Sequence, residues 1–134
     1  MLFQALVFNV VNLIFYAILY LIAVLLTRWL SKIQEYDDRW VPSLILNAIW
    51  FAVVLGTWLV MYLIFSFDFL IQINFIIALP ANIILGIIIV YNENLFDIDD
   101  YKDCLKFVLL NLFLLFVILL VAFFVSLFVF ASLA

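Results

Sequence analysis

The chain has 134 residues, of which 73% are hydrophobic and 10% charged, and its formal net charge is −4. A soluble domain has about 25% charged and about 45–50% apolar residues, so this composition and a mean hydropathy of +1.49 exclude a water-soluble fold. The acidic balance argues against nucleic acid as a partner, because nucleic-acid binding needs basic patches.

The sequence offers few groups that carry chemistry. It holds one cysteine, Cys104, and no histidine, which excludes an intrachain disulfide, a CxxC site and bis-histidine haem ligation within one chain. No Ser-His or Cys-His pair is available, and two glycines are too few for a phosphate-binding loop. We therefore expect a protein that is not an enzyme and needs no cofactor.

Four long apolar runs are the main feature of the sequence. A helix needs about 20 mostly apolar residues to cross about 30 Å of hydrocarbon. Segments 2–27, 43–66, 69–91 and 106–132 meet this requirement. They are continuous, unlike the alternating segments of about ten residues in a transmembrane barrel. The sequence predicts an all-α fold: an integral membrane four-helix bundle, antiparallel and up-down, that forms one four-span domain over 1–134.

The first span carries one stripe of small and polar residues. Read at about 100° per residue, the stripe covers an arc of about 80°. Its members are Ala5, Asn9, Asn12, Tyr16, Tyr20, Ala23 and Thr27. Lipid cannot satisfy amide and phenol groups, so we expect this stripe to pack against protein. The segment has no basic region or cleavage site of a signal peptide, and we expect it to be retained.

The second span opens at Pro42 after a polar link and carries Ala48, Ala52 and Gly56 at four-residue spacing. Such a small-xxx-small run lets another helix backbone approach closely. The other side of this span holds Ser43, Asn47, Trp50 and Trp58. Because the next turn, around Asp68, is very short, the second and third spans are predicted to form an antiparallel hairpin.

The third and fourth spans repeat the pattern. The third carries Asn74, Ala78, Asn82 and Gly86 four apart, with Pro80 predicted to kink the helix. In the link that follows, Asp97 or Asp99 is expected to cap the last helix. On the fourth span, Asn111, Leu115, Ile118, Ala122 and Ser126 share a face, and most phenylalanines point elsewhere.

These asparagines suggest how the helices are matched in depth. We expect Asn47 and Asn111 to lie at one interface, on the second and fourth spans, and Asn9 and Asn74 near the other. Interhelical amide contacts in membranes are worth about 0.6 kcal/mol each, so they set register more than stability.

The basic residues predict orientation. All five, Arg28, Lys32, Arg39, Lys102 and Lys106, lie in or beside the first and third links. Loop cations stay in the cytoplasm and acidic residues contribute little to orientation. The links 28–42 and 92–105 are therefore expected to be cytoplasmic, with both termini outside.

One cluster of carboxylates deserves a metal hypothesis: Asp97, Asp99, Asp100 and Asp103. Hard cations such as Ca²⁺ and Mg²⁺ take oxygen ligands. No glycine supplies the turn of a calcium loop, however, and a solvated link that caps a helix explains the acids more simply. We assign no metal ligand here.

The uncharged polar residues within the spans allow two interpretations. Asn12, Tyr16, Tyr20, Asn47, Asn82 and Asn111 either bond one another between helices or line a crevice for a neutral solute or a lipid headgroup. We favour packing. No Asp, Glu, Lys or Arg lies in the core of a span, which argues against an ion-coupled transporter or pump.

No motif is specific enough to name a family. The leading hypothesis is a small non-catalytic polytopic membrane protein that acts through intramembrane helix contacts, as a subunit, assembly factor or immunity-type protein. Its expected partners are membrane lipids and either another membrane protein or further copies of itself. The alternative is a small transporter or channel, as a single chain or an oligomer, for a neutral or lipid-like solute. An enzyme remains an option only if the acidic link binds a metal.

Overall fold

The computed structural model describes the backbone of residues 2–66 and 71–133 and the side chains of 14–66, 72–129 and 131–132. Within these residues the chain forms four α-helices: α1 (Leu2–Ile33), α2 (Trp40–Phe65), α3 (Ile71–Ile87) and α4 (Tyr101–Leu133). A π-helical turn, η1 (Ile88–Asn92), continues α3. No strand occurs in the described part of the chain.

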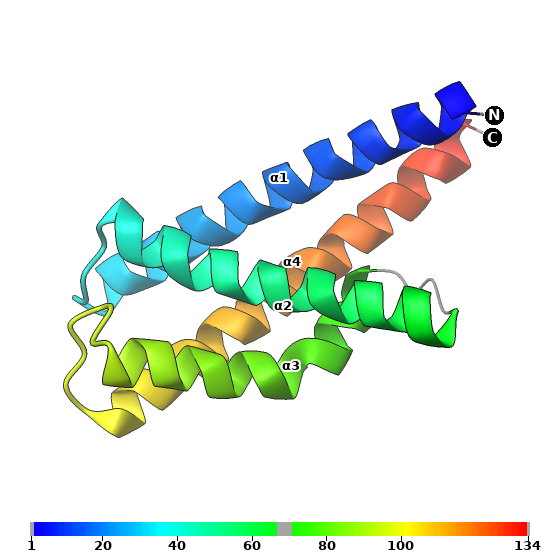
Figure 1. The fold of residues 1–134 in the computed structure, drawn as a ribbon. Helices are drawn as coiled ribbons and strands as arrows, with labels where there is room; N and C mark the ends of the chain where they lie inside the picture. The colour runs from blue at the N-terminus through cyan, green and yellow to red at the C-terminus, as the bar shows by residue number, and fades with distance from the viewer. Residues whose placement is uncertain (1, 67–70, 134) are drawn as a thin grey trace.

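The helices alternate in direction. The links 34–39 and 93–100 lie together at one end of the molecule, and α1 begins and α4 finishes at the other (Figure 1). We call these the link end and the terminal end. Helix α2 packs on both α1 and α3, α3 packs on α4, and α4 completes the set beside α1. The predicted all-α, antiparallel, up-down four-helix bundle is confirmed.

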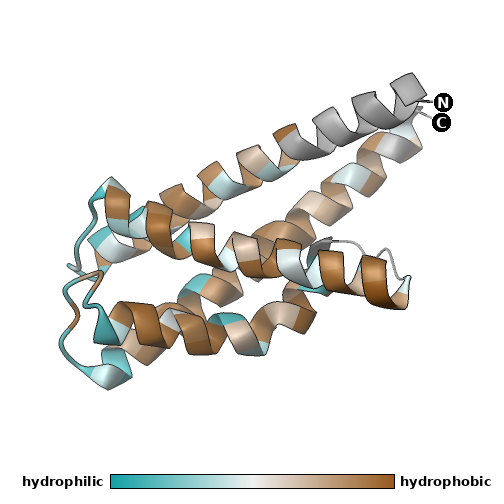
Figure 2. Ribbon diagram, viewed as in Figure 1, coloured by the Kyte–Doolittle hydropathy of each residue, from teal (hydrophilic) through white to brown (hydrophobic). Residues whose placement is uncertain are grey.

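Each helix is long and apolar enough to cross a membrane. The candidate spans are Ile14–Ile33, Trp40–Phe65, Gln72–Asn92 and Tyr101–Val129. Apolar residues cover the helices along most of their length, and hydrophilic residues gather at the link end (Figure 2). The chain is therefore a multi-pass integral membrane protein.

At the link end the helices extend beyond the predicted spans. Helix α1 continues through Arg28 to Ile33 because arginine and lysine are good helix formers once the chain leaves the hydrocarbon. The hydroxyl of Ser31 donates to the Thr27 carbonyl at 2.8 Å within this extension. Pro42 lies in the first turn of α2, as predicted, where its missing N–H costs nothing.

Two helix ends depend on particular residues. Ser66 ends α2 in the left-handed conformation, with φ 59°, and its N–H bonds the carbonyl of Met61. Asp100 caps α4, since its Oδ1 accepts a hydrogen bond from the N–H of Lys102 at 3.0 Å. The expected cap at Asp97 or Asp99 is thus one to three residues too early. Asp68, in the turn between α2 and α3, lies outside the described residues.

Aromatic rings close the core at the link end. The fully buried rings of Phe96 and Phe107 lie 4.7 Å apart, and the Tyr36 ring contacts Phe107 at 5.6 Å. The N–H of Asp37 donates to the carbonyl of Phe96 at 3.1 Å, which ties the two links together. Phe107 is therefore an exception to the expectation that most phenylalanines of the last span point away from the bundle, which Phe113 and others nearer the terminal end follow.

Candidate functional site

A buried polar contact joins α1 to α2. The side-chain Nδ2 of Asn47 donates to Thr27 Oγ1 and to the Ser43 carbonyl, both at 2.9 Å. On α2, one turn before Asn47, the carbonyl of Leu44 accepts a hydrogen bond from the hydroxyl of Tyr20 at 2.8 Å. Tyr20, Thr27 and the buried Ala23 belong to the stripe predicted on the first span, and they face the bundle.

A second contact joins α2 to α3 and α4. The indole Nε1 of Trp50 donates to the backbone carbonyl of Asn82 at 3.0 Å. A Cβ placed on Gly86 would lie 2.9 Å from Val108 Cγ1 and 3.1 Å from the Trp50 ring. The absence of a side chain at Gly86 thus lets three helices meet at one point.

Asn82 and Asn111 lie at the same level beyond this meeting point. Gly86 opposes Val108 across the α3–α4 interface, and the two helices are antiparallel. One turn toward the terminal end therefore leads to Asn82 on α3 and Asn111 on α4. Both are buried; neither amide atom of Asn82 has a partner, and neither does Oδ1 of Asn111. Burying an amide atom without a hydrogen bond costs free energy.

The predicted pairing of asparagines differs in the structure. Asn47 bonds Thr27 on α1, whereas the Nδ2 of Asn111 donates to the Phe107 carbonyl of its own helix at 2.9 Å. The sequence does not show on which side of α2 each asparagine finds its neighbour. Asn74 is buried on α3, but the side chains of Ala5, Asn9 and Asn12 lie outside the described residues, so the Asn9–Asn74 pairing stays a prediction.

The other residues predicted to pack between helices differ in how deeply they are buried. Ala78 is buried in α3, and Tyr16, Ala122 and Ser126 are half-buried. Ser126 donates to the Ala122 carbonyl within α4 at 2.8 Å. Sequence reasoning missed Gln72, whose Nε2 donates to the carbonyl of Leu119 on α4 at 3.0 Å; a lone glutamine in an apolar run is the signal that would have drawn attention to it.

The small-residue run of α2 lies on the outside. Ala48 and Ala52 are exposed, and a Cβ placed on Gly56 would meet nothing within 4 Å. Inside the bundle α2 uses its other side, with Ser43, Asn47, Trp50 and the neighbouring buried residues. The run therefore does not hold these four helices together. We call Ala48, Ala52 and Gly56, with the exposed Ile45, Leu55 and Leu59 around them, the open α2 face.

The acidic residues after Asn92 lie mostly on the surface. Asp97, Asp99 and Asp100 are exposed and Asp103 is half-buried. Over the described residues, no three His, Cys, Asp or Glu side chains come together in a way that would hold a metal ion. The thiol of Cys104 is buried, 3.6 Å from the carbonyl of Ile98.

Charged residues fix the first link. Arg39 pairs with the Asp37 carboxylate at 2.7 Å, and this hydrogen-bonded pair lowers the pKa of Asp37. The guanidinium of Arg28 lies 3.9 Å from the Trp40 ring centroid, and its Nε donates to the Asp38 carbonyl at 2.7 Å. Burial, followed by the charge of Asp103, raises the pKa of Tyr36. These contacts hold the link in place.

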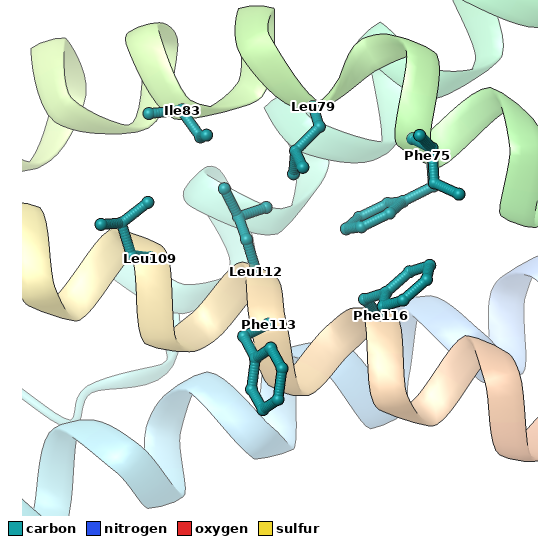
Figure 3. A pocket seen from close by; sticks show the side chains of 8 residues that line it. Phe75, Leu79, Ile83, Leu109, Leu112, Phe113 and Phe116 are labelled. Atoms are coloured by element: carbon teal, nitrogen blue, oxygen red, sulfur yellow. The ribbon is translucent and has the colours of Figure 1, made fainter.

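An apolar groove separates the middle parts of α3 and α4. It encloses about 310 Å³. Figure 3 shows Phe75, Leu79 and Ile83 of α3 on one side, opposite residues of α4. We call this the α3/α4 groove.

Comparison of the chain with family models, curated proteins and solved structures found no match.

Proposed function

We propose that this protein is a non-catalytic membrane component that binds a helix of another membrane-spanning chain. It acts as a subunit, an assembly factor or an immunity-type protein. The observation that carries the proposal is the open α2 face. Close helix approach in membranes uses small residues, because lipid supplies no hydrophobic driving force and packing decides.

The two glycines make the argument specific. At Gly86 a Cβ would clash with Val108, so this glycine already packs against a helix of the same bundle. At Gly56 the same Cβ would meet nothing. Ala52 lies one turn and Ala48 two turns before Gly56, which makes this surface flat enough for a second helix backbone to approach. No Asp, Glu, Lys or Arg lies in the core of a span, where it could couple to an ion, and this favours binding over pumping.

Affinity purification from native membranes tests this proposal. The variant Ala52→Leu places a branched side chain on the open α2 face, and Ala17→Leu makes the same change at an exposed position of α1. We expect a stoichiometric partner to copurify with the parent chain and with Ala17→Leu, and to be lost with Ala52→Leu. If that partner is a second copy, the mass in detergent falls from dimer to monomer with Ala52→Leu alone.

Two outcomes contradict the proposal. One is a parent chain that is monomeric and carries no stoichiometric partner. The other is a partner that stays bound to Ala52→Leu. Helical circular dichroism and a symmetric elution peak serve as the control that the variants remain folded.

We propose further that the link end faces the cytoplasm and that both termini face away from it. The support is the position of the basic residues, since all five lie in or beside the two links. A reporter active only outside the cytoplasm, fused after residue 134, is expected to be active. An inactive external reporter together with a fluorescent cytoplasmic one contradicts this orientation.

The buried amides favour a second candidate, a transporter or channel for a neutral solute. Asn82 and Asn111 present unpartnered amide atoms in the bundle, and Ser43 Oγ is also buried without a partner. Purified protein in vesicles is then expected to carry glycerol or urea faster than empty vesicles, and Asn82→Leu to abolish the excess. Flux at the background rate with an intact bundle excludes this candidate.

A further inference from the structure

The α3/α4 groove lies between two contacts that join these helices, and the rings of Phe75 and Phe116 stack within it, 6.0 Å apart. Toward the terminal end, Gln72 bonds the Leu119 carbonyl at 3.0 Å. Toward the link end, Gly86 lies against Val108. Between these contacts Pro80 lies inside α3 and weakens the helix there, since proline donates no backbone hydrogen bond and crowds the preceding turn. The first turns of α3 run at an angle to the rest of the helix (Figure 1).

The groove is apolar and open on one side. Phe75, Leu79 and Ile83 point from α3 toward Leu109, Leu112 and Phe116 on α4 (Figure 3). At its rim Ile76 is 51% and Phe113 62% exposed, so the groove opens to the surroundings of the bundle. All of these residues lie within candidate membrane spans. The medium at the opening is therefore hydrocarbon.

The path from Lys106 to the deep end of the groove is about as long as one leaflet is deep. Lys106 and Phe116 are ten residues apart on α4, which is about 15 Å at 1.5 Å per residue. Half of the hydrocarbon thickness is also about 15 Å. With Lys106 at the headgroup level, the lining residues from Leu109 to Phe116 lie in the half of the bilayer at the link end.

A cation stands at the outer end of this path. Lys106 is exposed and precedes Leu109 by three residues and Phe113 by seven, so the three share a face of α4. Lys106 makes no ion pair within the described part of the chain. Its long side chain can reach the phosphate level while its stem stays along the helix.

We propose that the α3/α4 groove holds one acyl chain of a phospholipid from the leaflet at the link end, with the headgroup phosphate beside Lys106. A helix, about 10–12 Å wide, cannot enter between two helices that touch above and below the opening. A single hydrocarbon chain is narrower and matches the lining chemically. This site is independent of the open α2 face and goes beyond the proposed function.

Photolabelling in vesicles tests the proposal. The parent chain is reconstituted in phosphatidylglycerol that contains a trace of the same lipid with a diazirine midway along one acyl chain. After irradiation, the labelled residues are mapped by mass spectrometry. We expect adducts to concentrate on groove residues such as Ile76 and Phe113, well above the level at Leu21 and Leu25 of α1, which are comparably exposed.

Matched variants test whether the acyl chain lies in the groove. Ile83→Phe with Leu109→Phe fills the groove, while Ile84→Phe with Leu110→Phe adds the same bulk at the adjacent positions, which do not line it. The first pair is expected to lose the excess labelling and the second to keep it. Lys106→Gln is expected to lower the excess, and Lys32→Gln, an exposed lysine on α1, to leave it unchanged.

The proposal is overturned if adducts on the parent chain follow exposure alone, with no excess in the groove. That measurement needs no variant and does not depend on whether the substituted chains fold. Excess labelling that survives the groove-filling pair in a folded protein overturns the location, and labelling that is unchanged by Lys106→Gln overturns the phosphate contact.

Discussion

The two glycines allow one packing contact to be measured against a matched control. Gly86→Ala adds a Cβ that would lie 2.9 Å from Val108 Cγ1 and 3.1 Å from the Trp50 ring. Neither neighbour moves easily: valine is stiff at χ1, and the indole of Trp50 is held by its hydrogen bond to Asn82. Gly56→Ala adds the same atom where nothing lies within 4 Å.

The magnitude follows from the difference between the two variants. Both gain about 1 kcal/mol from the higher helix propensity of alanine, so this contribution cancels. Overpacking of a core costs about 1–3 kcal/mol, and it applies to Gly86→Ala alone. The free energy of unfolding of Gly86→Ala is therefore expected to lie about 1–3 kcal/mol below that of Gly56→Ala, which is a factor of about 5 to about 160 in the equilibrium constant.

Unfolding by sodium dodecyl sulfate in mixed micelles, followed by tryptophan fluorescence, measures this difference. Gly56→Ala is expected to unfold at the same or a higher detergent fraction than the parent chain, and Gly86→Ala at a lower one. Equal unfolding midpoints for the two variants would refute the claim that three helices meet at Gly86.

Three further predictions concern other contacts. Thr27→Val removes the acceptor of the Asn47 amide and is expected to lower the free energy of unfolding by about 0.6 kcal/mol, while Thr27→Ser retains it; an equal loss in both variants contradicts the role of the hydroxyl. Burial raises the pKa of Tyr36. The neutral Tyr36 side chain therefore stabilises the fold below about pH 10, and this stabilisation is lost as the pH rises through the raised pKa. Melting temperatures measured from about pH 8 to about 11.5 are expected to fall at the alkaline end, and Tyr36→Phe is expected to reduce this fall. Pro80→Ala restores a backbone donor, straightens α3 and is expected to reduce photolabelling in the α3/α4 groove; unchanged labelling shows that the proline does not shape it.

The spans and their directions could be predicted from the sequence, because length and apolarity alone decide what crosses hydrocarbon. The predicted segments agree with the helices except near the link end, where α1 continues to Ile33 and α4 starts at Tyr101. Those turns are in or near water, and their helicity comes from local propensity and from the cap at Asp100, which hydropathy does not report.

The rotation of each helix was harder to predict. In a soluble bundle the apolar side faces inward, but in lipid both sides of a helix are apolar. Helix α2 offered two plausible contact sides, Ala48–Ala52–Gly56 and Ser43–Asn47–Trp50, and the bundle uses the second. The contact of Asn47 with Thr27 and the bond from Trp50 to the Asn82 carbonyl decide this, and both depend on partners far away in the sequence.

The α3/α4 groove was not predicted. Pro80 signalled a kink, but a kink opens a groove only when the neighbouring helix is held above and below it. The Gln72–Leu119 bond and the Gly86–Val108 contact do this, and neither is visible from the spacing of residues within one span.

The central claim is that α2 turns Trp50 into the bundle and leaves Ala52 toward lipid or a partner. An oxygen-collision scan of spin labels tests it directly, with single cysteines placed from Ser43 to Leu59 in a Cys104→Ala background and one chain per bicelle. We predict maxima at Ala48, Ala52 and Leu55 and minima at Leu46, Trp50 and Val54. The opposite phase, with Ala52 protected and Trp50 accessible, would contradict the account.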